Sequence, residues 1–407
     1  MNKSSNSRLK KFKADNRKDI VTILYKDGCV SRLELTKRLK LSKASVSLLV
    51  AEMIEQGLIV EWGLSIEKKT GSGPRERLLA LSGDYAGVLG ISIERDYVSI
   101  GLCNLQNKTI QSTFRKTSEF SAGKAAFLDE IAQMATALLR PTDPKLLPPI
   151  LLGCAITIIG TVDQQSGVSI NSFGLLPKNT SISDYFADKL NMPVWVENNV
   201  RALAMANYNY HSSAKEESCV FLKHGQGLGG AIIIDSQLLM GSTNEAGEVG
   251  HTVVAGNDAP CGCGKNGCLE TLVSEEAILK SIPLDKYKYP VLSGLCDGDR
   301  RNLDIEKVLE AIDAGEKALM DHFQDALHYL AQSIANLYIL VNPSVFILYG
   351  VIFQNEQVVD LLYSHLKHIM KDDAILATLK ISRLESRKNY YGATDLVLRK
   401  YFESGAF

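Results

Sequence analysis

Two neighbouring stretches, Glu245-Ala-Gly-Glu-Val-Gly-His251 and Cys261-Gly-Cys-Gly-Lys-Asn-Gly-Cys-Leu-Glu270, carry the most specific pattern in this 407-residue sequence. The second offers three closely spaced thiols, and the first ends on an imidazole shortly before them. Three sulfurs and one nitrogen form a closed tetrahedral site, which is typical of structural zinc and leaves no position for catalysis. The interposed glycines let the loop fold tightly around an ion. We therefore predict a structural Zn²⁺ held by His251, Cys261, Cys263 and Cys268.

The remaining cysteines are isolated in sequence, and the polar, basic N-terminus lacks the apolar core of a secretory signal. This pattern favours metal ligands over a disulfide framework. The two most apolar stretches, 150–162 and 339–353, are too short to span a membrane. We expect a cytoplasmic protein that does not contact a membrane.

Strands and helices alternate from Gly83 onward. A long amphipathic helix at about 315–340 is expected to pack either in the core or at a subunit contact. The first part of this region is predicted to form three strands, a helix and a buried strand, at 87–93, 97–105, 109–115, 122–139 and 150–158. The order indicates a mixed-sheet α/β domain and not an all-parallel Rossmann fold.

The chain resembles the ROK family of repressors, open reading frames and kinases over essentially its whole length. The resemblance rests on the two stretches quoted first and on Gly160-Thr-Val-Asp163, Val196-Glu-Asn-Asn199 and Gly225-Gln-Gly-Leu-Gly229. It implies a two-lobed, actin-like (ribonuclease H-like) ATPase fold over 83–407. Lobe one would span about 83–201 plus a C-terminal helix around 392–402, and lobe two about 202–385 with the zinc.

Sugar recognition needs carboxylates and amides, because each sugar hydroxyl both donates and accepts a hydrogen bond. Glu248 and Glu270 are close in sequence to metal ligands, and a zinc-bound histidine can direct its second nitrogen at a hydroxyl. In the family, the positions matching Asn198, Glu248, His251 and Glu270 contact the sugar. Asn199, whose amide can also bind a hydroxyl, completes the predicted site.

The residues for phosphoryl transfer are missing in three places. Family kinases have a catalytic aspartate where this chain has Asn199, which cannot take a proton from a hydroxyl at neutral pH. Their glycine-containing phosphate hairpin corresponds here to 91–97, which includes Arg95 and has no glycine. Tyr349 stands where the kinases have a double glycine. A glycine-rich loop at 225–230 is weak evidence for ATP by itself. We predict a sugar sensor and not an enzyme.

Residues 1–82 read as a winged helix-turn-helix. Apolar residues predict a first helix over 16–27, and Ser31 with Glu34 forms a capping-box pattern before a second helix. Ser42 caps a third helix with a buried stripe at Val46, Leu49, Val50 and Met53. Two strands then flank a glycine- and proline-rich wing whose tip carries Lys68, Lys69 and Arg75.

The third helix presents small and polar side chains on its other face. Such a face fits a major groove and lets hydroxyls and an ammonium group reach bases and phosphates. The head holds 17 Lys and Arg against 9 Asp and Glu, whereas the remaining chain is acidic, so the head is the part that meets a polyanion. The predicted DNA-contacting residues are Ser42, Lys43, Ala44, Ser45, Ser47 and Arg75.

Together these features predict a sugar-responsive repressor of carbohydrate-utilisation genes, with double-stranded DNA and a small sugar as partners. A homodimer or homotetramer is expected, because paired heads would read two half-sites. Glucose, xylose, N-acetylglucosamine or an oligosaccharide would each suit the site. Two alternatives stay open: an ATP-dependent sugar kinase that also binds DNA, and a repressor controlled by a protein partner.

Overall fold

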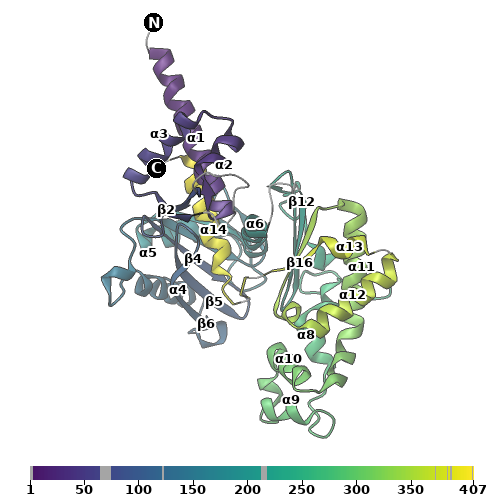
Figure 1. Ribbon diagram of the computed structural model, residues 1–407. Helices are drawn as coiled ribbons and strands as arrows, with labels where there is room; N and C mark the ends of the chain where they lie inside the picture. Colours follow the sequence, from purple (N-terminus) through teal and green to yellow (C-terminus); the bar gives the residue numbers. More distant parts are fainter. Residues whose placement is uncertain are drawn as a thin grey trace.

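The computed structural model describes residues 3–64, 75–121, 123–211, 218–371, 373–382, 384–385, 387–405 and 407. The chain forms a small head and two lobes that lie side by side (Figure 1). Within these ranges, no helix is long and apolar enough to cross a membrane.

The head is a winged helix-turn-helix. Its sheet has the strand order β1-β3-β2. Ser31 and Ser42 cap α2 and α3 by accepting hydrogen bonds from the backbone N–H groups of Glu34 and Ser45. The predicted apolar stripe of α3 is buried. The elements are α1 (Lys3–Asp27), β1 (Val30–Ser31), α2 (Arg32–Leu39), α3 (Lys43–Glu55), β2 (Ile59–Leu64) and β3 (Arg77–Leu81).

Two details of the head differ from expectation. The first helix begins at Lys3 and not near residue 16, since no glycine or proline interrupts the chain before Gly28. The capping box is only half formed, because the Glu34 carboxylate pairs with Arg38 one turn later. Lys68 and Lys69 of the predicted wing tip lie outside the described residues.

Lobe one contains a five-stranded sheet of order β11-β7-β4-β5-β6. Strands β4, β5 and β6 are antiparallel neighbours, whereas β7 and β11 run parallel to β4. Leu89 and Ile91 face α4 and α5, while Val88 faces α14 and the head. The elements are β4 (Gly87–Ile93), β5 (Tyr97–Asn104), β6 (Thr109–Lys116), α4 (Lys124–Leu138), β7 (Leu151–Ile158), β8 (Thr161–Asp163), β9 (Val168–Asn171), β10 (Thr180–Ser181), α5 (Ile182–Leu190) and β11 (Val194–Asn198).

Lobe two has a second five-stranded sheet, of order β14-β13-β12-β15-β16. The predicted helix at 315–340 is divided, because a 3-10 segment over Lys317–Phe323 buries Leu319 and Phe323 before α11 begins. The elements are β12 (Ser218–His224), β13 (Leu228–Ile234), β14 (Gln237–Leu238), α7 (Glu270–Val273), α8 (Glu275–Ser281), α9 (Pro290–Leu295), α10 (Ile305–Asp313), α11 (Gln324–Val341), β15 (Val345–Tyr349), α12 (Glu356–Met370), α13 (Ala374–Thr378) and β16 (Leu379–Ile381).

Two helices connect these parts. The apolar face of α6 (Asn199–His211) packs on the sheet of lobe two through Leu203 and Tyr208. The same helix lies close to α14 (Tyr390–Ser404), where a Cβ on Gly392 would come within 2.8 Å of the Leu203 backbone nitrogen. The head shares a hydrophobic core with α14, and the Tyr25 hydroxyl donates a 2.6 Å hydrogen bond to Asp395. The head is therefore packed on lobe one and not tethered loosely to it.

Candidate functional site

The structure brings the four predicted metal ligands together. His251 ends a 3-10 turn over Val249–His251, and the three cysteines lie in the loop that leads to α7. One ligand atom from each residue lies within 4.8 Å of the others. The Sγ atoms of Cys263 and Cys268 are 3.6 Å apart, and Cys261 Sγ is 3.6 Å from His251 Nδ1. This cluster could hold a metal ion.

The loop around the cluster is closed by backbone contacts. The N–H of Cys261 donates to the carbonyl of Lys265 at 2.9 Å, and Val253 forms a bridge with Cys268. Gly267 has a φ of +79°, and a Cβ there would lie 2.4 Å from the carbonyl oxygen of Asn257. Only glycine satisfies both conditions, so Gly267 is required for the fold of the loop.

Both predicted sugar carboxylates lie near this cluster. Glu270, at the start of α7, places Oε1 3.0 Å from Cys261 Sγ and 3.7 Å from His251 Nδ1. Because Nδ1 is the ring nitrogen turned to the cluster, Nε2 lies on the opposite side of the imidazole. Burial raises the pKa of Glu248, and the nearby charges of His251 and Arg201 offset part of that rise.

The two predicted asparagines lie at the junction of β11 and α6 and are almost fully buried. Asn198 donates a 2.8 Å hydrogen bond to the carbonyl of Gly160, and its Oδ1 accepts from the backbone of Arg201. Asn199 instead donates to Glu94 Oε2 at 2.7 Å. The neighbouring asparagines therefore point to different partners, so one sequence motif serves two parts of the site.

Arg201 connects this junction to the loop that carries Glu248. Its guanidinium lies 3.8 Å from Glu197 and donates to the backbone carbonyl of Asn244. Its Nη1 is buried without a hydrogen-bond acceptor among the described residues. Sequence reasoning missed Arg201, although a cation within the otherwise neutral segment 199–211 was a visible signal.

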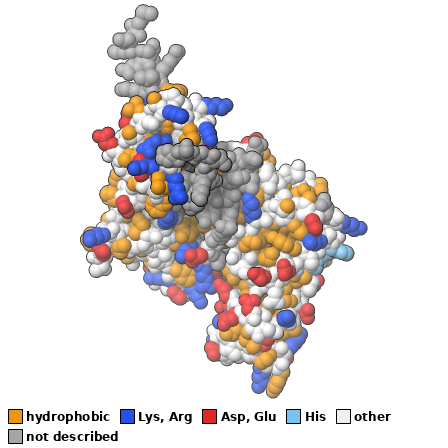
Figure 2. All heavy atoms as spheres, in the orientation of Figure 1, with side chains coloured by type: hydrophobic (Ala, Val, Ile, Leu, Met, Phe, Trp, Pro, Cys, Tyr) orange, Lys and Arg blue, Asp and Glu red, His pale blue; other side chains and the backbone are white. Residues whose placement is uncertain are grey.

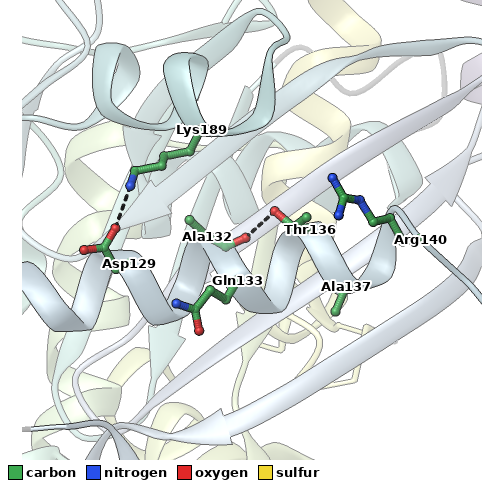
Figure 3. Close-up of a pocket in the computed structure, with 7 residues that line it drawn as sticks. All are labelled: Asp129, Ala132, Gln133, Thr136, Ala137, Arg140 and Lys189. Atoms are coloured by element: carbon green, nitrogen blue, oxygen red, sulfur yellow. Dashed lines mark hydrogen bonds and ion pairs between the residues drawn. The ribbon is translucent and has the colours of Figure 1, made fainter.

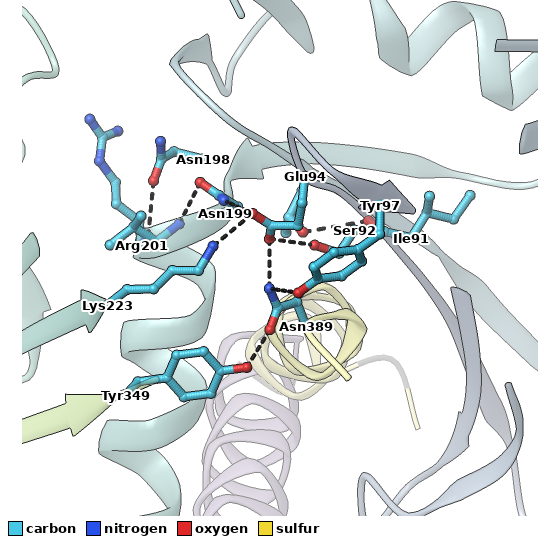
Figure 4. Close-up of polar contacts among 12 residues, drawn as sticks. Ile91, Ser92, Glu94, Tyr97, Asn198, Asn199, Arg201, Lys223, Tyr349 and Asn389 are labelled. Carbon is cyan, nitrogen blue, oxygen red and sulfur yellow. Dashed lines mark hydrogen bonds and ion pairs between the residues drawn. The ribbon is translucent and has the colours of Figure 1, made fainter. Parts of the chain in front are cut away.

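A second polar cluster joins the two lobes (Figure 4). Glu94 follows β4 and is 5% exposed. Its Oε2 also accepts a 2.7 Å hydrogen bond from Lys223 of β12, and its Oε1 accepts from Asn389 at 2.8 Å and Ser92 at 3.1 Å. Burial raises the pKa of Glu94, but the charge of Lys223 and these hydrogen bonds outweigh it and hold the pKa below its usual value.

In the stretch 91–97, the residue that matters between the lobes is Glu94 and not Arg95. Arg95 is exposed, and its neighbour Glu94 is the residue that points between the lobes. Tyr349 also contributes, because its hydroxyl donates to Asn389, which in turn donates to the Tyr97 hydroxyl at 2.6 Å. Three separate sequence departures therefore belong to one network.

More carboxylates lie beside the glycine-rich loop. The backbone N–H of Glu275 donates to the carbonyl of Gly225 at 2.9 Å. Burial, with the added repulsion of Glu306 and Asp96, raises the pKa of Glu275 to about 7. Lys223 and Arg387, the cations near Glu275, are themselves paired with Glu94 and Glu306.

The predicted DNA face is open to solvent. Every predicted contact residue on the α3 side is exposed, and so is Arg75. Leu48, 61% exposed, adds an apolar side chain to this face. The Ser42 and Ser45 hydroxyls are 2.8 Å apart, so part of their hydrogen-bonding capacity serves the helix cap. Lys and Arg side chains are spread over the head in the space-filling view (Figure 2).

A shallow hollow on lobe one is separate from these residues. Its volume is about 380 Å³, and it is lined mainly by α4, with an Asp129–Lys189 ion pair at its edge (Figure 3). None of the predicted sugar, metal or DNA residues lines it.

The fold and these sites define a class: a winged-helix head on a two-lobed, sugar-kinase-like domain. Residues 88–400 match the model described as "ROK family", and residues 13–60 match one described as "Winged helix-turn-helix DNA-binding". Because the first match covers most of the sequence, the chain belongs to the ROK family.

The chain is similar both to transcriptional regulators and to a sugar kinase. The chain is 27% identical to the xylose repressor of Caldicellulosiruptor bescii over 401 residues, which cover 95% of this chain and 96% of that protein. A crystal structure of a ROK family transcriptional regulator, a homologue of the Escherichia coli MLC protein, matches with a TM-score of 0.71, 23% identity and 97% coverage of both chains. A ROK family glucokinase from Streptomyces griseus, solved with glucose and AMPPNP, matches with a TM-score of 0.66, 24% identity, and 76% and 98% coverage.

Proposed function

We propose that the chain is a sugar-responsive transcriptional repressor of carbohydrate-utilisation genes, whose two-lobed domain binds a sugar without phosphorylating it. One observation carries this proposal. The carboxylate of Glu94 already accepts the hydrogen bonds of Lys223 and Asn199, at 2.7 Å each. A phosphoryl-transfer site would direct a cation such as Lys223 and a polar residue such as Asn199 at its substrates. Here both side chains are hydrogen-bonded to the same protein carboxylate, that of Glu94.

The surroundings oppose a nucleotide in two further ways. Phosphoryl transfer depends on cationic groups that neutralise the charge developing on the phosphate. Here Lys223 is paired with Glu94, and Arg387, the other cation near Glu275, is paired with Glu306. Asn199 has no basic atom to accept the proton of a sugar hydroxyl.

The sugar would bind where the β11–α6 junction faces the metal loop. Arg201 joins this junction to the loop that carries Glu248, through Glu197 and the Asn244 carbonyl. His251 turns Nδ1 to the cysteines, which leaves Nε2 for a ligand hydroxyl. We propose Asn198, Asn199, Glu248, His251 and Glu270 as the contacts.

The cluster of three thiols and an imidazole suits Zn²⁺, which prefers four such ligands in structural sites. We propose that Zn²⁺ is held by His251, Cys261, Cys263 and Cys268 and that it fixes the loop between His251 and α7. A bound Zn²⁺ would supply folding free energy and leave no coordination position for a substrate. Its contribution to sugar binding would be to hold Glu270 and the His251 ring in place.

The head would read DNA through Ser42, Lys43, Ala44, Ser45, Ser47 and Arg75. Exposure of the α3 face and the name of the xylose repressor relative support this assignment. We place the head at 1–82 and the two-lobed domain at 83–407. Two heads per operator would require at least a dimer.

Calorimetry of the purified chain against xylose, glucose and N-acetylglucosamine tests the sensor, first without and then with ATP and Mg²⁺. We expect saturable binding of at least one sugar and no release of ADP. Steady phosphorylation of a sugar would establish the kinase alternative. No measurable binding of any of the three sugars, with intact binding to the protein's own promoter, would favour control by a protein partner.

A further inference from the structure

A buried carboxylate and a partly buried ammonium group meet between the lobes. Glu94 belongs to lobe one and Lys223 to lobe two, and their side chains are 6% and 15% exposed. Charges this deeply buried are retained only when they are paired and hydrogen-bonded, because desolvation alone is costly. Glu94 meets this condition through Lys223, Asn199, Asn389 and Ser92.

The pair lies between the turn that follows β4 and the strand that precedes the glycine-rich loop. Glu94 occupies the turn between β4 and β5, and Lys223 lies two residues before the glycine-rich loop that starts at Gly225. A carboxylate has the same sign as a phosphate oxygen and binds the same ammonium group. The chain therefore carries its own anion between the lobes.

Asn199 donates a hydrogen bond to this carboxylate. Its Nδ2 lies 2.7 Å from Glu94 Oε2, so an aspartate at this position would place two carboxylates in contact. An amide donates where a second carboxylate would repel. Asn199 is also the first residue of α6, directly after Asn198. The residue that donates to Glu94 and the proposed sugar contact Asn198 therefore lie on one backbone segment.

We propose that Glu94 and Lys223 form an ionic latch that holds the two lobes together without nucleotide and that fixes Asn199 for sugar binding. The second half rests on the proposed sugar site. Breaking the pair loosens the position of Glu94 and of the Asn199 amide that donates to it, and it releases the end of β4 from β12. The first effect weakens the sugar complex, and the second widens the gap between the lobes.

The test uses the full chain with Glu94→Gln, Lys223→Met and the double variant. Lys280→Met is the matched control, because it breaks an exposed pair with Glu276 in the same lobe. Fluorophores introduced as non-natural amino acids at exposed Lys145 and Tyr287 report the distance between lobes and avoid the cysteines. Labelled chains are measured in an excess of unlabelled chain, so that only distances within one chain contribute.

We expect both single variants to lengthen and broaden the inter-lobe distance and to weaken sugar binding about tenfold. The double variant should match the single variants, because either change alone opens the latch. Distances equal to those of wild type and Lys280→Met would overturn the latch. Longer distances with unchanged sugar affinity would overturn its link to Asn199. If wild type binds none of the three sugars, the proposed function fails, and the distances still decide the latch.

Discussion

Asn199→Asp restores the residue that family kinases use as a base, and we expect it to destabilise this chain in a pH-dependent manner. The new carboxylate would lie about 2.7 Å from Glu94. At an effective dielectric constant near 20, two unit charges at that distance repel by about 6 kcal/mol. The pair can avoid this cost by sharing a proton. A carboxyl with an ordinary pKa near 3.9 takes up a proton at a cost of about 4 kcal/mol at pH 7 and about 1.5 kcal/mol at pH 5.

The cost of taking up the shared proton therefore sets the expected loss of unfolding free energy, and the nearby Lys223 lowers this loss somewhat. The variant should lose about 2 to 3 kcal/mol more unfolding free energy at pH 7 than at pH 5. The sign follows from the raised pKa of the pair, since stability is lost as pH rises through that value. Asn199→Ala is the matched control, because it removes the hydrogen bond without adding a charge.

Urea unfolding at the two pH values, followed by intrinsic fluorescence, measures this difference. We also expect no sugar phosphorylation by Asn199→Asp, because Glu94 would still engage Lys223. Equal losses at pH 5 and pH 7, or losses no different from those of Asn199→Ala, would refute the contact between residues 199 and 94. Recovery of kinase activity would refute the view that the network as a whole excludes catalysis.

Four other changes have expected outcomes. Glu275→Gln should raise the unfolding free energy at pH 8 by up to about 3 kcal/mol relative to its effect at pH 4. The folded-state pKa of Glu275, about 7, exceeds the ordinary value, so wild type loses stability as pH rises toward it. An unchanged pH profile in urea titrations would contradict this. Cys263→Ser should lose the zinc that elemental analysis finds near one equivalent in wild type, and should lower Tm; a metal-free wild type of full stability would argue against the metal site. Lys43→Ala should weaken promoter binding by about 1 kcal/mol and reduce the salt slope by about one in fluorescence anisotropy titrations, if the ammonium meets a phosphate. Glu248→Ala should abolish the sugar response while leaving promoter affinity without sugar near wild type, and a parallel loss of DNA binding would show that the effect is structural.

Local patterns in the sequence were enough for much of the fold. The α3 stripe and the strands at 87–93 and 109–115 follow from the periodicity of apolar residues, which is fixed within a few turns or pleats. The metal cluster was equally predictable, because three of its four ligands lie within one short loop. The resemblance to the ROK family supplied the two-lobed architecture, which local patterns alone do not specify.

The inter-lobe network depended on tertiary structure. The sequence shows Glu94, Arg95 and Asp96 as one charged run, and only the end of β4 decides that Glu94 turns inward while Arg95 faces solvent. The partner of Glu94 lies 129 residues away, at the end of a strand in another sheet. Pairing over that separation depends on how two sheets and α6 pack against one another. The sequence by itself therefore located the positions where this chain differs from the family's kinases, and the packing of the lobes decided which groups Glu94, Asn199 and Tyr349 contact there.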